Sequence, residues 1–286
     1  TGNEKTLDEF YMDLRIDQIA QAFAKKGKMT DIRTIWNCRE EFKNQLANWF
    51  RWRTENDMID ALTGLITDGV TKLEGAAADS TPLVNGAGRC FRPDYANSAF
   101  TTELVAAADS TTTSLLSTLA ATDVMNTQLL DNLQVLAKTA GAYPMKPIRA
   151  KNGEEYYLLV IHPKAGIALR SDERWEKRAL ASMTGKGSLE GDPIATGAIG
   201  VWEKIIVKEA EYIKTHTNSA GTLKIARNLL LGADAAVLAY AQTLDYNEEL
   251  RDYKREMGVA ADEIRGMKKL TFNGVDMNIA QVPCAI

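Results

Sequence analysis

Two histidines are the residues of this sequence whose type most readily suggests acid–base chemistry or metal binding. His162 lies in the stretch VIHPKAGIALRSDERW, where it ends an apolar run and directly precedes Pro163. His216 lies far from it in sequence, in KTHTNSAG. Imidazole titrates near neutral pH, so either side chain could act with a cysteine or carboxylate that the fold brings close. Neither histidine occurs in an HExxH motif, which argues against a zinc site of that type.

Pro163 gives His162 a structural interpretation, which we favour over a catalytic one. Proline has no backbone N–H and a fixed φ, so it ends a strand and suits the first turn of a helix. It also holds the preceding residue in an extended conformation. We therefore expect His162 to end a buried strand with its ring hydrogen-bonded locally, and His216 to be exposed on a turn. A soluble α+β enzyme that uses His162 is the alternative.

The other catalytic and nucleotide-binding motifs are absent or weak. The chain contains neither GxSxG nor GxxxxGK[ST], which are typical of hydrolase serines and phosphate-binding loops. GKGSLEG, residues 185–191, has its third glycine one position too late for a nucleotide loop, and we interpret it as a flexible loop. The acid pairs Glu154-Glu155 and Glu248-Glu249 are typical of a solvated face. We predict no catalytic, cofactor-binding or metal-binding residue and no cofactor.

Cysteine usage and charge restrict the remaining classes. Cys38, Cys90 and Cys284 are an odd number at wide spacing, so we expect thiols in a reducing compartment. The net charge of −4 argues against a dedicated nucleic-acid binder. Basic residues of the C-terminal region are interspersed with acids and predict a mixed surface: Lys254, Arg255, Arg265, Lys268 and Lys269.

The sequence predicts neither a membrane-spanning helix nor a signal peptide. No run approaches the roughly 18 apolar residues of a membrane helix, and we see no signal peptide at the start. The chain begins at Thr1 without a methionine. We interpret this as processing, a trimmed tag or a fragment of a longer protein.

Hydrophobic periodicity predicts helices in the N-terminal half. Residues 6–63 read as two helices, the first capped by Thr6 and stopped by Gly27, the second capped by Thr30 and running to about Leu62. The apolar face of the second helix is expected to include Ile35, Phe42, Leu46 and Trp49. Trp36, Trp49, Phe50 and Trp52 form an aromatic cluster, which we assign to packing before a stacking platform.

Two further segments of this half differ in character. Residues 64–112 are rich in Gly, Ala, Ser, Asn and Pro and predict a long irregular excursion. Residues 113–140 carry an apolar stripe at steps of three and four, which predicts an amphipathic helix ended by Gly141. A helix with one apolar face is expected to lie across a sheet.

The C-terminal half predicts mixed structure. We expect a buried strand over 155–161, helix over 164–182, irregular chain over 184–200 and a strand in the first half of VWEKIIVKEAEYI. Gly232 should separate two short elements in NLLLGADAAVLAYA, because a glycine inside a helix is unfavourable. Asn273-Gly274 between two alternating runs predicts a type I′ hairpin.

Several stretches, taken as a series, resemble the major capsid proteins of tailed bacteriophages with the Hong Kong 97 fold. The branch most similar is the one typified by the major coat protein of coliphage N four. The stretches that carry the resemblance are TGNEKTLDEFYMDLRIDQIAQAFAKKGKMTDIRT, YYLLVIHPKAGIALRSDERW, GDPIATGAIGVWEKIIVKE, ARNLLLGADAAVLAYA and MGVAADEIRGMKKLTFNG. Members of the branch are longer at the N-terminus, so an N-terminal arm is expected to precede this chain.

This resemblance implies an α+β subunit with a long spine helix, a peripheral-domain sheet and an axial domain. We expect residues 1–112 to be an N-terminal helical region and excursion, and 113–142 to be the spine helix of the peripheral domain. Residues 143–267 should hold the axial domain and a connecting strand of the peripheral domain. The terminal hairpin, 268–286, should return to the peripheral domain. An extended loop to the neighbouring subunit lies either in 64–112 or in the N-terminal part that precedes the chain.

The same resemblance implies a major capsid protein and not an enzyme. Its partners would be copies of itself, in hexamers and pentamers of an icosahedral shell that encloses double-stranded DNA without reading its sequence. Scaffold, portal and decoration proteins are further expected partners, and no membrane is. The protein would be found in the virion after assembly in the host cytoplasm. An encapsulin-type compartment shell is the alternative within the same fold.

Overall fold

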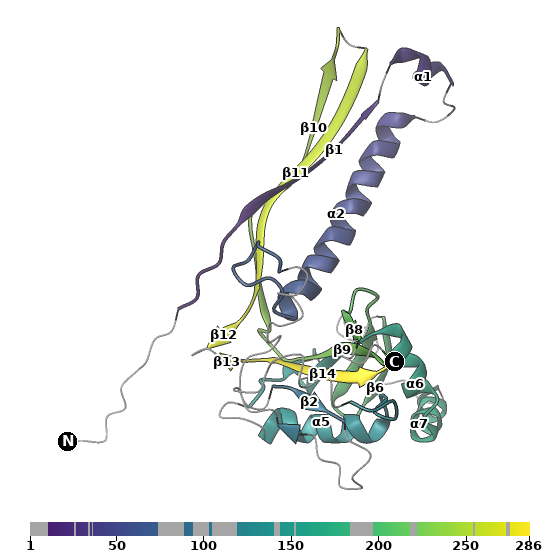
Figure 1. Cartoon of the computed structure of the whole chain (residues 1–286), viewed down its shortest axis with the longest axis vertical. Helices are drawn as coiled ribbons and strands as arrows, with labels where there is room; N and C mark the ends of the chain where they lie inside the picture. The colour runs from purple at the N-terminus through teal and green to yellow at the C-terminus, as the bar shows by residue number, and fades with distance from the viewer. Residues whose placement is uncertain are drawn as a thin grey trace, which may run out of the picture.

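A computed structural model describes residues 11–25, 27–33, 35, 37–73, 89–93, 103–104, 119–139, 144–151, 153–183, 197–217, 222–253, 255–272 and 275–286. Two sheets organise these residues (Figure 1). A three-stranded sheet of order β1-β11-β10, called the long sheet below, carries the long helix α2 on one face. A seven-stranded sheet lies near the C-terminus and packs against α5, α6 and α7.

The long sheet joins strands from opposite ends of the chain. It consists of β1 (Asp17–Lys25), β10 (Ala236–Arg251) and β11 (Glu256–Lys269), all antiparallel. The helix predicted to run to Gly27 is therefore wrong over β1, while residues 6–10 lie outside the described residues. Ile19 and Phe23 fit helical and strand periodicity equally, and pairing with β11 decides for the strand.

Helix α2 (Cys38–Leu62) confirms the second predicted helix and its end. Its N-cap is Asn37, whose side chain accepts a hydrogen bond from Arg39 N at 3.2 Å. The predicted cap, Thr30, instead lies inside the short helix α1 (Lys28–Arg33). Ile35 precedes α2 and is fully exposed, so its predicted place on the apolar face is wrong.

Packing of α2 on the long sheet rests on a compact apolar cluster. Leu46 and Phe50 are buried against Val259 and Ala261 of β11. The two β11 residues are separated by one position, as expected for one face of a strand. The alternate residues after Ala261 share this inward face and are also buried: Glu263, Arg265, Met267 and Lys269.

The seven-stranded sheet has the order β14-β9-β5-β7-β6, with β4 added on β5 and β8 on β9. Strands β5 and β7 are parallel, and the other pairs are antiparallel. The strand predicted at 155–161 is confirmed as β5. The single strand predicted in the first half of VWEKIIVKEAEYI is instead divided by a turn at Glu203-Lys204, which separates the antiparallel strands β6 and β7. The bounds are β4 (Ile148–Arg149), β5 (Glu155–Ile161), β6 (Ala198–Trp202), β7 (Ile205–Glu209), β8 (Thr215–Thr217), β9 (Lys224–Leu231) and β14 (Ile279–Ala285).

Helices α5 (Thr127–Thr139), α6 (Pro163–Arg170) and α7 (Glu173–Met183) share the main core with this sheet. The predicted helix over 164–182 is confirmed as α6 and α7. The helix predicted over 113–140 is shorter than expected: 119–126 is not helical, and 113–118 and 140 lie outside the described residues. Its apolar stripe is real, because Leu129, Leu133 and Ala137 are buried in that core.

The C-terminal segments link the two sheets. β12 (Thr271–Phe272) and β13 (Val275–Asp276) pair across Asn273-Gly274, so the predicted hairpin is confirmed, although those two residues lie outside the described ones. β14 then joins β9 in the seven-stranded sheet and not the long sheet. The predicted break at Gly232 is also confirmed, since it separates β9 from β10.

The excursion predicted over 64–112 is described only in pieces. Within it, β2 (Phe91–Arg92) pairs with β3 (Glu103–Leu104). Cys90 forms a parallel bridge with Gln281, so this piece runs beside β14. Residues 64–73 of the excursion form an irregular turn after α2, with an antiparallel bridge between Ile66 and Lys72. Residues 74–88, 94–102 and 105–112 lie outside the described ones.

Candidate functional site

His162 occupies the structural position that the sequence predicts. It follows β5 and is the N-cap of α6, with φ −69° and ψ 143°. Its Nδ1 accepts a hydrogen bond from Lys164 N at 3.2 Å, and Pro163 occupies the first turn. Burial and the nearby Lys164 charge hold the His162 pKa below its usual value. The ring is thus engaged in capping a helix and not directed at a nucleophile.

The remaining single-residue candidates also lack catalytic surroundings. His216 lies in β8, half-buried, so the predicted exposed turn is wrong. None of the three cysteines forms a disulfide, as predicted. Among the residues that the structure describes, no group of three or more His, Cys, Asp or Glu side chains could hold a metal ion. The GKGSLEG loop lies outside those residues.

The aromatic cluster of α2 serves mainly in packing, as predicted. Phe50 is buried and meets Trp49 edge to face at a centroid distance of 4.9 Å. Trp52 is 46% exposed and contacts the edge of Tyr212, near the seven-stranded sheet. Trp36 lies outside the described residues.

Two basic residues predicted on a mixed surface are instead buried. Arg265 is 2% exposed and Lys269 is 9% exposed, because both share the inward face of β11 with Val259 and Ala261. The signal that sequence reasoning missed is the spacing: Arg265 and Lys269 lie an even number of positions after Val259 and Ala261, so all of these side chains point to the same face of one strand. Sequence reasoning did not use it because the strand itself was not recognised.

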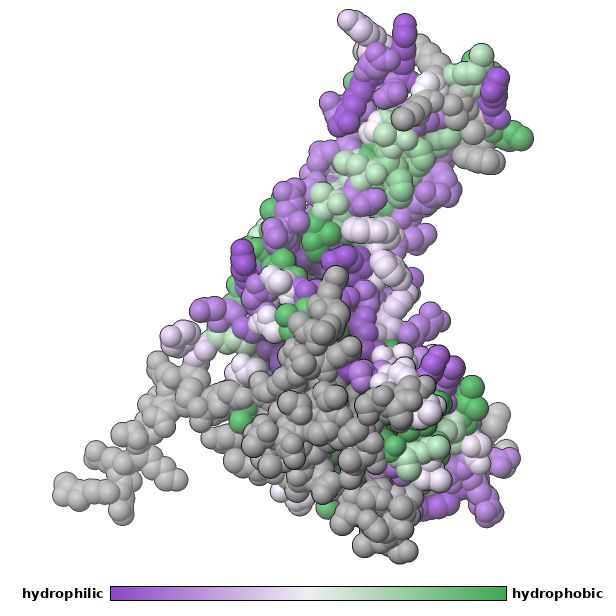
Figure 2. Space-filling model, in the orientation of Figure 1, coloured by the Kyte–Doolittle hydropathy of each residue, from purple (hydrophilic) through white to green (hydrophobic). Residues whose placement is uncertain are grey.

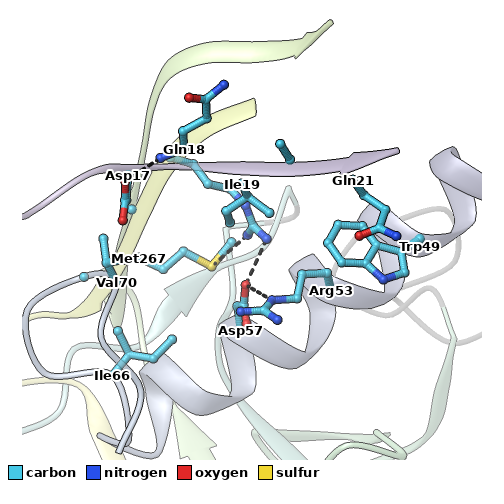
Figure 3. Close-up of a pocket in the computed structure, with 14 residues that line it drawn as sticks. Asp17, Gln18, Ile19, Gln21, Trp49, Arg53, Asp57, Ile66, Val70 and Met267 are labelled. Carbon is cyan, nitrogen blue, oxygen red and sulfur yellow. Dashed lines mark hydrogen bonds and ion pairs between the residues drawn. The ribbon is translucent and has the colours of Figure 1, made fainter. Parts of the chain in front are cut away.

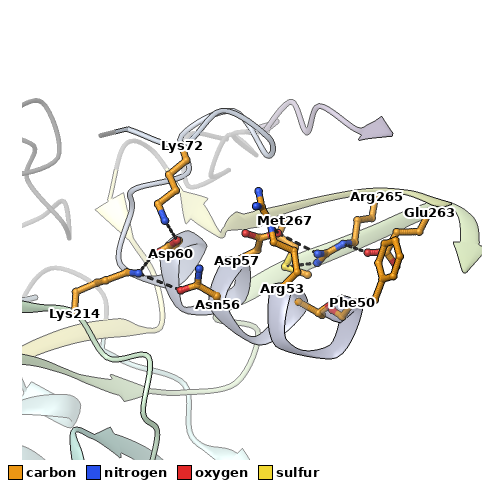
Figure 4. A network of polar contacts seen from close by, with 11 residues as sticks. Phe50, Arg53, Asn56, Asp57, Asp60, Lys72, Lys214, Glu263, Arg265 and Met267 are labelled. Carbon is orange, nitrogen blue, oxygen red and sulfur yellow. Dashed lines mark hydrogen bonds and ion pairs between the residues drawn. The ribbon is translucent and has the colours of Figure 1, made fainter. Parts of the chain in front are cut away.

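Arg265 forms the centre of one buried ionic cluster between β11 and α2 (Figure 4). Its guanidinium lies 3.0 Å from Asp57 of α2 and also pairs with Glu263 of β11. Arg53, one turn before Asp57, contacts the same carboxylate at 3.0 Å. The two carboxylates are thus matched by two guanidinium groups, which is what burial of charge requires.

A second cluster lies at the end of α2, around Asp60 (Figure 4). The Asp60 carboxylate is completely buried and receives Lys72 at 2.6 Å and Lys214 at 2.9 Å. Lys214 also donates to Asn56 Oδ1 at 3.1 Å. Lys72 comes from the turn after α2, and Lys214 from the chain before β8. Asp60 therefore ties α2 to the seven-stranded sheet.

Apolar contacts also join the end of α2 to the seven-stranded sheet. Ile59 and Leu62 of α2 share a buried cluster with Leu229 and Leu231 of β9 and with Ile279 of β14. These strand residues alternate with Leu230, Ala280 and Val282, which face the main core under α5. The seven-stranded sheet is therefore covered on both faces at this point, and the end of α2 provides part of the second cover.

A third cluster surrounds Asp276 of β13. Its carboxylate is completely buried and pairs with Lys269 of β11 at 2.7 Å, while its backbone carbonyl accepts from Arg89 Nε at 2.7 Å. Burial lowers the Arg89 pKa and the Asp276 charge raises it, with burial prevailing. Arg89 O in turn accepts from Gln281 N at 2.8 Å. This cluster joins the long sheet, the hairpin and β14.

A cavity of about 430 Å³ lies beside the first cluster, between β1, α2 and the turn over 66–70 (Figure 3). Its wall is mixed and includes the apolar side chains of Trp49, Ile66 and Met267 as well as the paired charges of Arg53 and Asp57. It contains no histidine, cysteine or serine. The cavity thus offers neither a nucleophile nor an unmatched acid–base pair.

Next to this cavity, the backbone at Arg15 passes close to Gly266 of β11 and to Gly69. A Cβ on Gly266 would lie 2.1 Å from Arg15 O, and one on Gly69 would lie 2.5 Å from the same atom. Arg15 N donates to Asp68 O at 2.9 Å, and Met267 N donates to Gly69 O at 3.0 Å. Two glycines are required here because the backbone of Arg15 passes between them.

The clusters around Asp60 and Asp276 form a junction between the two sheets, whereas the Arg265 cluster and the cavity lie within the part built by α2 and the long sheet. Buried charges that join different elements favour one relative orientation, because any other orientation leaves a charge without its partner. Such a junction fixes how the two sheets are held together, and its described residues include no group aimed at a substrate. Among the described helices, none is long and apolar enough to cross a membrane.

A model of the phage capsid protein family matches residues 1–284. The chain belongs to this family. A major capsid protein of Pseudomonas phage KPP25 is 26% identical over 295 residues, covering 96% of this chain and 73% of the relative. The family match identifies a structural protein of phage heads and so places this chain among virion proteins.

Solved structures show the same fold. The capsid of Ralstonia phage GP4 superposes with a TM-score of 0.73 at 23% identity, covering 94% of this chain and 73% of that one. The capsid subunit of cyanophage Pam1 gives 0.72 at 21% identity, covering 100% and 81%. The predicted α+β class with a Hong Kong 97-like fold is therefore confirmed.

Proposed function

We propose that this phage capsid protein is a major capsid protein that self-assembles into an icosahedral shell around double-stranded DNA. The family match over residues 1–284 is the observation that carries the proposal. Copies of the chain would be its main partners, arranged in hexamers and pentamers. Many modest interfaces per subunit then add up to a stable particle.

The distribution of exposed apolar side chains supports assembly through the long sheet and its neighbouring helices. Figure 2 shows hydrophobic side chains at the surface of this part of the molecule. Large contiguous apolar patches are uncommon on monomers and mark interaction sites. Independently of that view, the large apolar and aromatic side chains of this part that are 37–100% exposed are Met29, Ile32, Ile35, Trp52, Met58, Leu238, Tyr240, Tyr246, Leu250 and Tyr253. On the helices of the seven-stranded sheet, only Val135 and Ile167 among the described residues are comparable.

The domain division is part of the proposal. We assign the peripheral domain to α2 and the long sheet, and the axial domain to the seven-stranded sheet with α5, α6 and α7. Helix α2 has 25 residues and lies on the long sheet, so it suits the role of spine helix better than α5, which has 13. This division replaces the one expected from sequence, in which residues 113–142 were the spine helix and residues 268–286 returned to the peripheral domain. Because β14 pairs with β9, we assign the last strand to the axial domain.

The phage branch, the lack of catalysis, the place of assembly and the further partners are also part of the proposal. The likeness to the branch typified by the coliphage N four coat protein rests on the sequence stretches quoted above. The absence of catalysis is supported by the paired state of the buried carboxylates. Assembly in the host cytoplasm, and contacts with scaffold, portal or decoration proteins, are proposed on the sequence resemblance alone. The net charge of −4 suits an inner wall that does not bind packaged DNA tightly.

An encapsulin-type compartment is the weaker candidate, because the family model describes phage capsid proteins. Sedimentation and electron microscopy of the expressed chain, with any preceding arm and scaffold restored, test the proposal. We expect rings or shells. A chain that stays monomeric under every assembly condition would contradict it.

A matched pair of variants sharpens the test. Ile35→Ser changes a fully exposed side chain near α1, whereas Ile167→Ser changes a 65% exposed side chain on α6. Neither side chain contributes to a buried core, so both variants should fold. We expect Ile35→Ser to reduce assembly at least about tenfold, through loss of an interface anchor, and Ile167→Ser to assemble normally. Equal assembly of both variants would argue against the proposed surface.

A further inference from the structure

Lys25 and Cys38 form a close contact between the end of β1 and the start of α2. Lys25 Nζ donates a hydrogen bond to Cys38 Sγ at 3.0 Å. Lys25 is 7% exposed, and Cys38 is half-buried. The amine is therefore held against the sulfur of a cysteine that is not fully buried. In Figure 1 this contact lies where β1, α1 and α2 approach one another, far from the seven-stranded sheet.

The surroundings of Cys38 favour its thiolate form. An ammonium group in contact with the sulfur stabilises negative charge on it. Cys38 is also the first residue of a 25-residue helix, whose N-terminus carries a partial positive charge. The thiolate is the nucleophilic form of cysteine, so these two features increase its reactivity.

The other two cysteines provide an internal comparison. Cys90 is 7% exposed and Cys284 is completely buried. Burial raises the Cys284 pKa far above its usual value, which keeps that thiol protonated. Buried, protonated thiols are unreactive. Cys38 is therefore the one cysteine of the chain with both access and activation.

We propose that Lys25 and Cys38 form a reducible covalent cross-link when the protein meets a peroxide. The Cys38 thiolate attacks one peroxide oxygen, the O–O bond breaks, and the sulfur becomes a sulfenic acid. The Lys25 ammonium gives a proton to the departing oxygen, which leaves as water. Sulfur is oxidised by two electrons in this step and the peroxide is reduced by two.

The neutral Lys25 amine then lies beside an electrophilic sulfur. Sulfenic acids condense with thiols and with nitrogen nucleophiles. The amine attacks sulfur, the S–O bond breaks, and a second water leaves with the sulfenic oxygen and one amine proton. An S–N bond now joins the two side chains. The protein has lost two hydrogens in total, and a thiol reductant returns the original pair.

The cross-link would close residues 25–38 into a loop that contains α1. It would join the last residue of an edge strand to the first residue of the long helix, so β1 could no longer separate from α2. This inference goes beyond the proposed capsid function, because it concerns a reaction within one chain and does not require assembly.

Mass spectrometry of the full chain tests the cross-link. We expect peroxide treatment to yield one linked pair of peptides containing Lys25 and Cys38, two hydrogens lighter than their sum, and to lose it on reduction. A linked pair that also retains one oxygen joins the same two residues and supports the inference. Oxidation of Cys38 to sulfinic acid without any linked pair would overturn it.

Three variants separate the roles of charge and nucleophile. Lys25→Arg keeps the cation but provides a poor nucleophile, so Cys38 should react quickly with a thiol reagent yet form no cross-link. Lys25→Met should lose both properties, and Cys38→Ser should form no link. In the unchanged protein, we expect Cys38 to be labelled at least about tenfold faster than Cys90 or Cys284. Equal labelling of all three cysteines in the folded chain would overturn the inference, as would a cross-link in Lys25→Met.

Discussion

Lys214 places its ammonium 2.9 Å from the completely buried carboxylate of Asp60. Lys214 precedes β8 of the seven-stranded sheet, and Asp60 lies in the last turns of α2. The contact thus joins the two parts that we assign to the axial and peripheral domains. A shell subunit built this way keeps its two parts in a defined orientation while its outer surfaces meet other copies.

The Asp60 carboxylate should be required for stability. Asp60→Asn leaves Lys72 and Lys214 without their counter-charge, and removal of one partner from a buried pair costs about 3 kcal/mol. Urea denaturation would measure this loss in the free energy of unfolding. Asp234→Asn is the matched control, because its 2.8 Å pair with Lys146 is more than 60% exposed on both sides. We expect the control to lose less than about 1 kcal/mol, and equal losses would contradict the assigned role.

Asp172 should stabilise two helices at once. Its Oδ2 accepts from Thr127 N and Oγ1 at the start of α5, both at 2.8 Å, and its Oδ1 accepts from Arg174 N at the start of α7. Burial favours the protonated form, but these hydrogen bonds outweigh it and hold the Asp172 pKa below its usual range. Asp172→Ala should cost about 2 kcal/mol, since helix caps contribute about 1 kcal/mol each.

The difference in unfolding free energy between the native protein and Asp172→Ala should depend on pH in a definite direction. Because the folded pKa is lowered, the stabilising contribution of Asp172 is complete above the unfolded pKa of about 3.9 and decreases as pH falls through the folded value. Unfolding free energies of the native protein and of Asp172→Ala, measured from pH 6 down to about pH 3, should therefore converge. A difference that grows on acidification would contradict this.

Gly232 should not tolerate a side chain. A Cβ at this position would lie 2.4 Å from Lys146 O and 3.3 Å from Asn278 Cβ. Both neighbours are held by hydrogen bonds, since Ala233 N donates to Lys146 O and Gly232 N donates to Asn278 O, each at 2.8 Å. Gly232→Ala should cost about 2 kcal/mol.

Gly258→Ala is the matched control for Gly232. A Cβ on Gly258, in β11, would meet its nearest neighbours at ordinary contact distances of 3.7 and 3.9 Å. We expect the midpoint of urea denaturation to shift clearly for Gly232→Ala and little for Gly258→Ala. A control that is as destabilised as the test variant would show that the close approach is not the cause.

His162 should matter as a helix cap and not as a catalyst. Its lowered pKa means that the fold favours the neutral ring, so its contribution is present above the unfolded pKa of about 6.5 and decreases as pH falls through the folded value. Because His162 is partly solvated, we expect a loss below about 1 kcal/mol. His162→Asn keeps a capping side chain and should remove this pH dependence, as measured by thermal unfolding between about pH 5 and pH 7. Unchanged pH dependence in that variant would contradict the assignment.

Much of the local structure could be predicted from sequence because its signals are local. The strand that ends before Pro163, the cap at His162, the Asn273-Gly274 hairpin and the break at Gly232 each depend on a few adjacent residues. The buried stripe of α5 follows from its own periodicity. The family resemblance likewise rested on short stretches and extended to the α+β class, which the solved capsid structures confirm.

The sequence by itself therefore determined β5, the helices α6 and α7, the buried stripe of α5 and the kind of protein to which they belong. Only the tertiary structure decided that residues 17–25 form a strand and that Arg265 and Lys269 are buried. The physical reason is that each depends on a partner distant in sequence: β1 pairs with β11, and Arg265 meets Asp57, across more than 200 residues. No local periodicity encodes such a partner, and a buried charge can be recognised only when its counter-charge is in place.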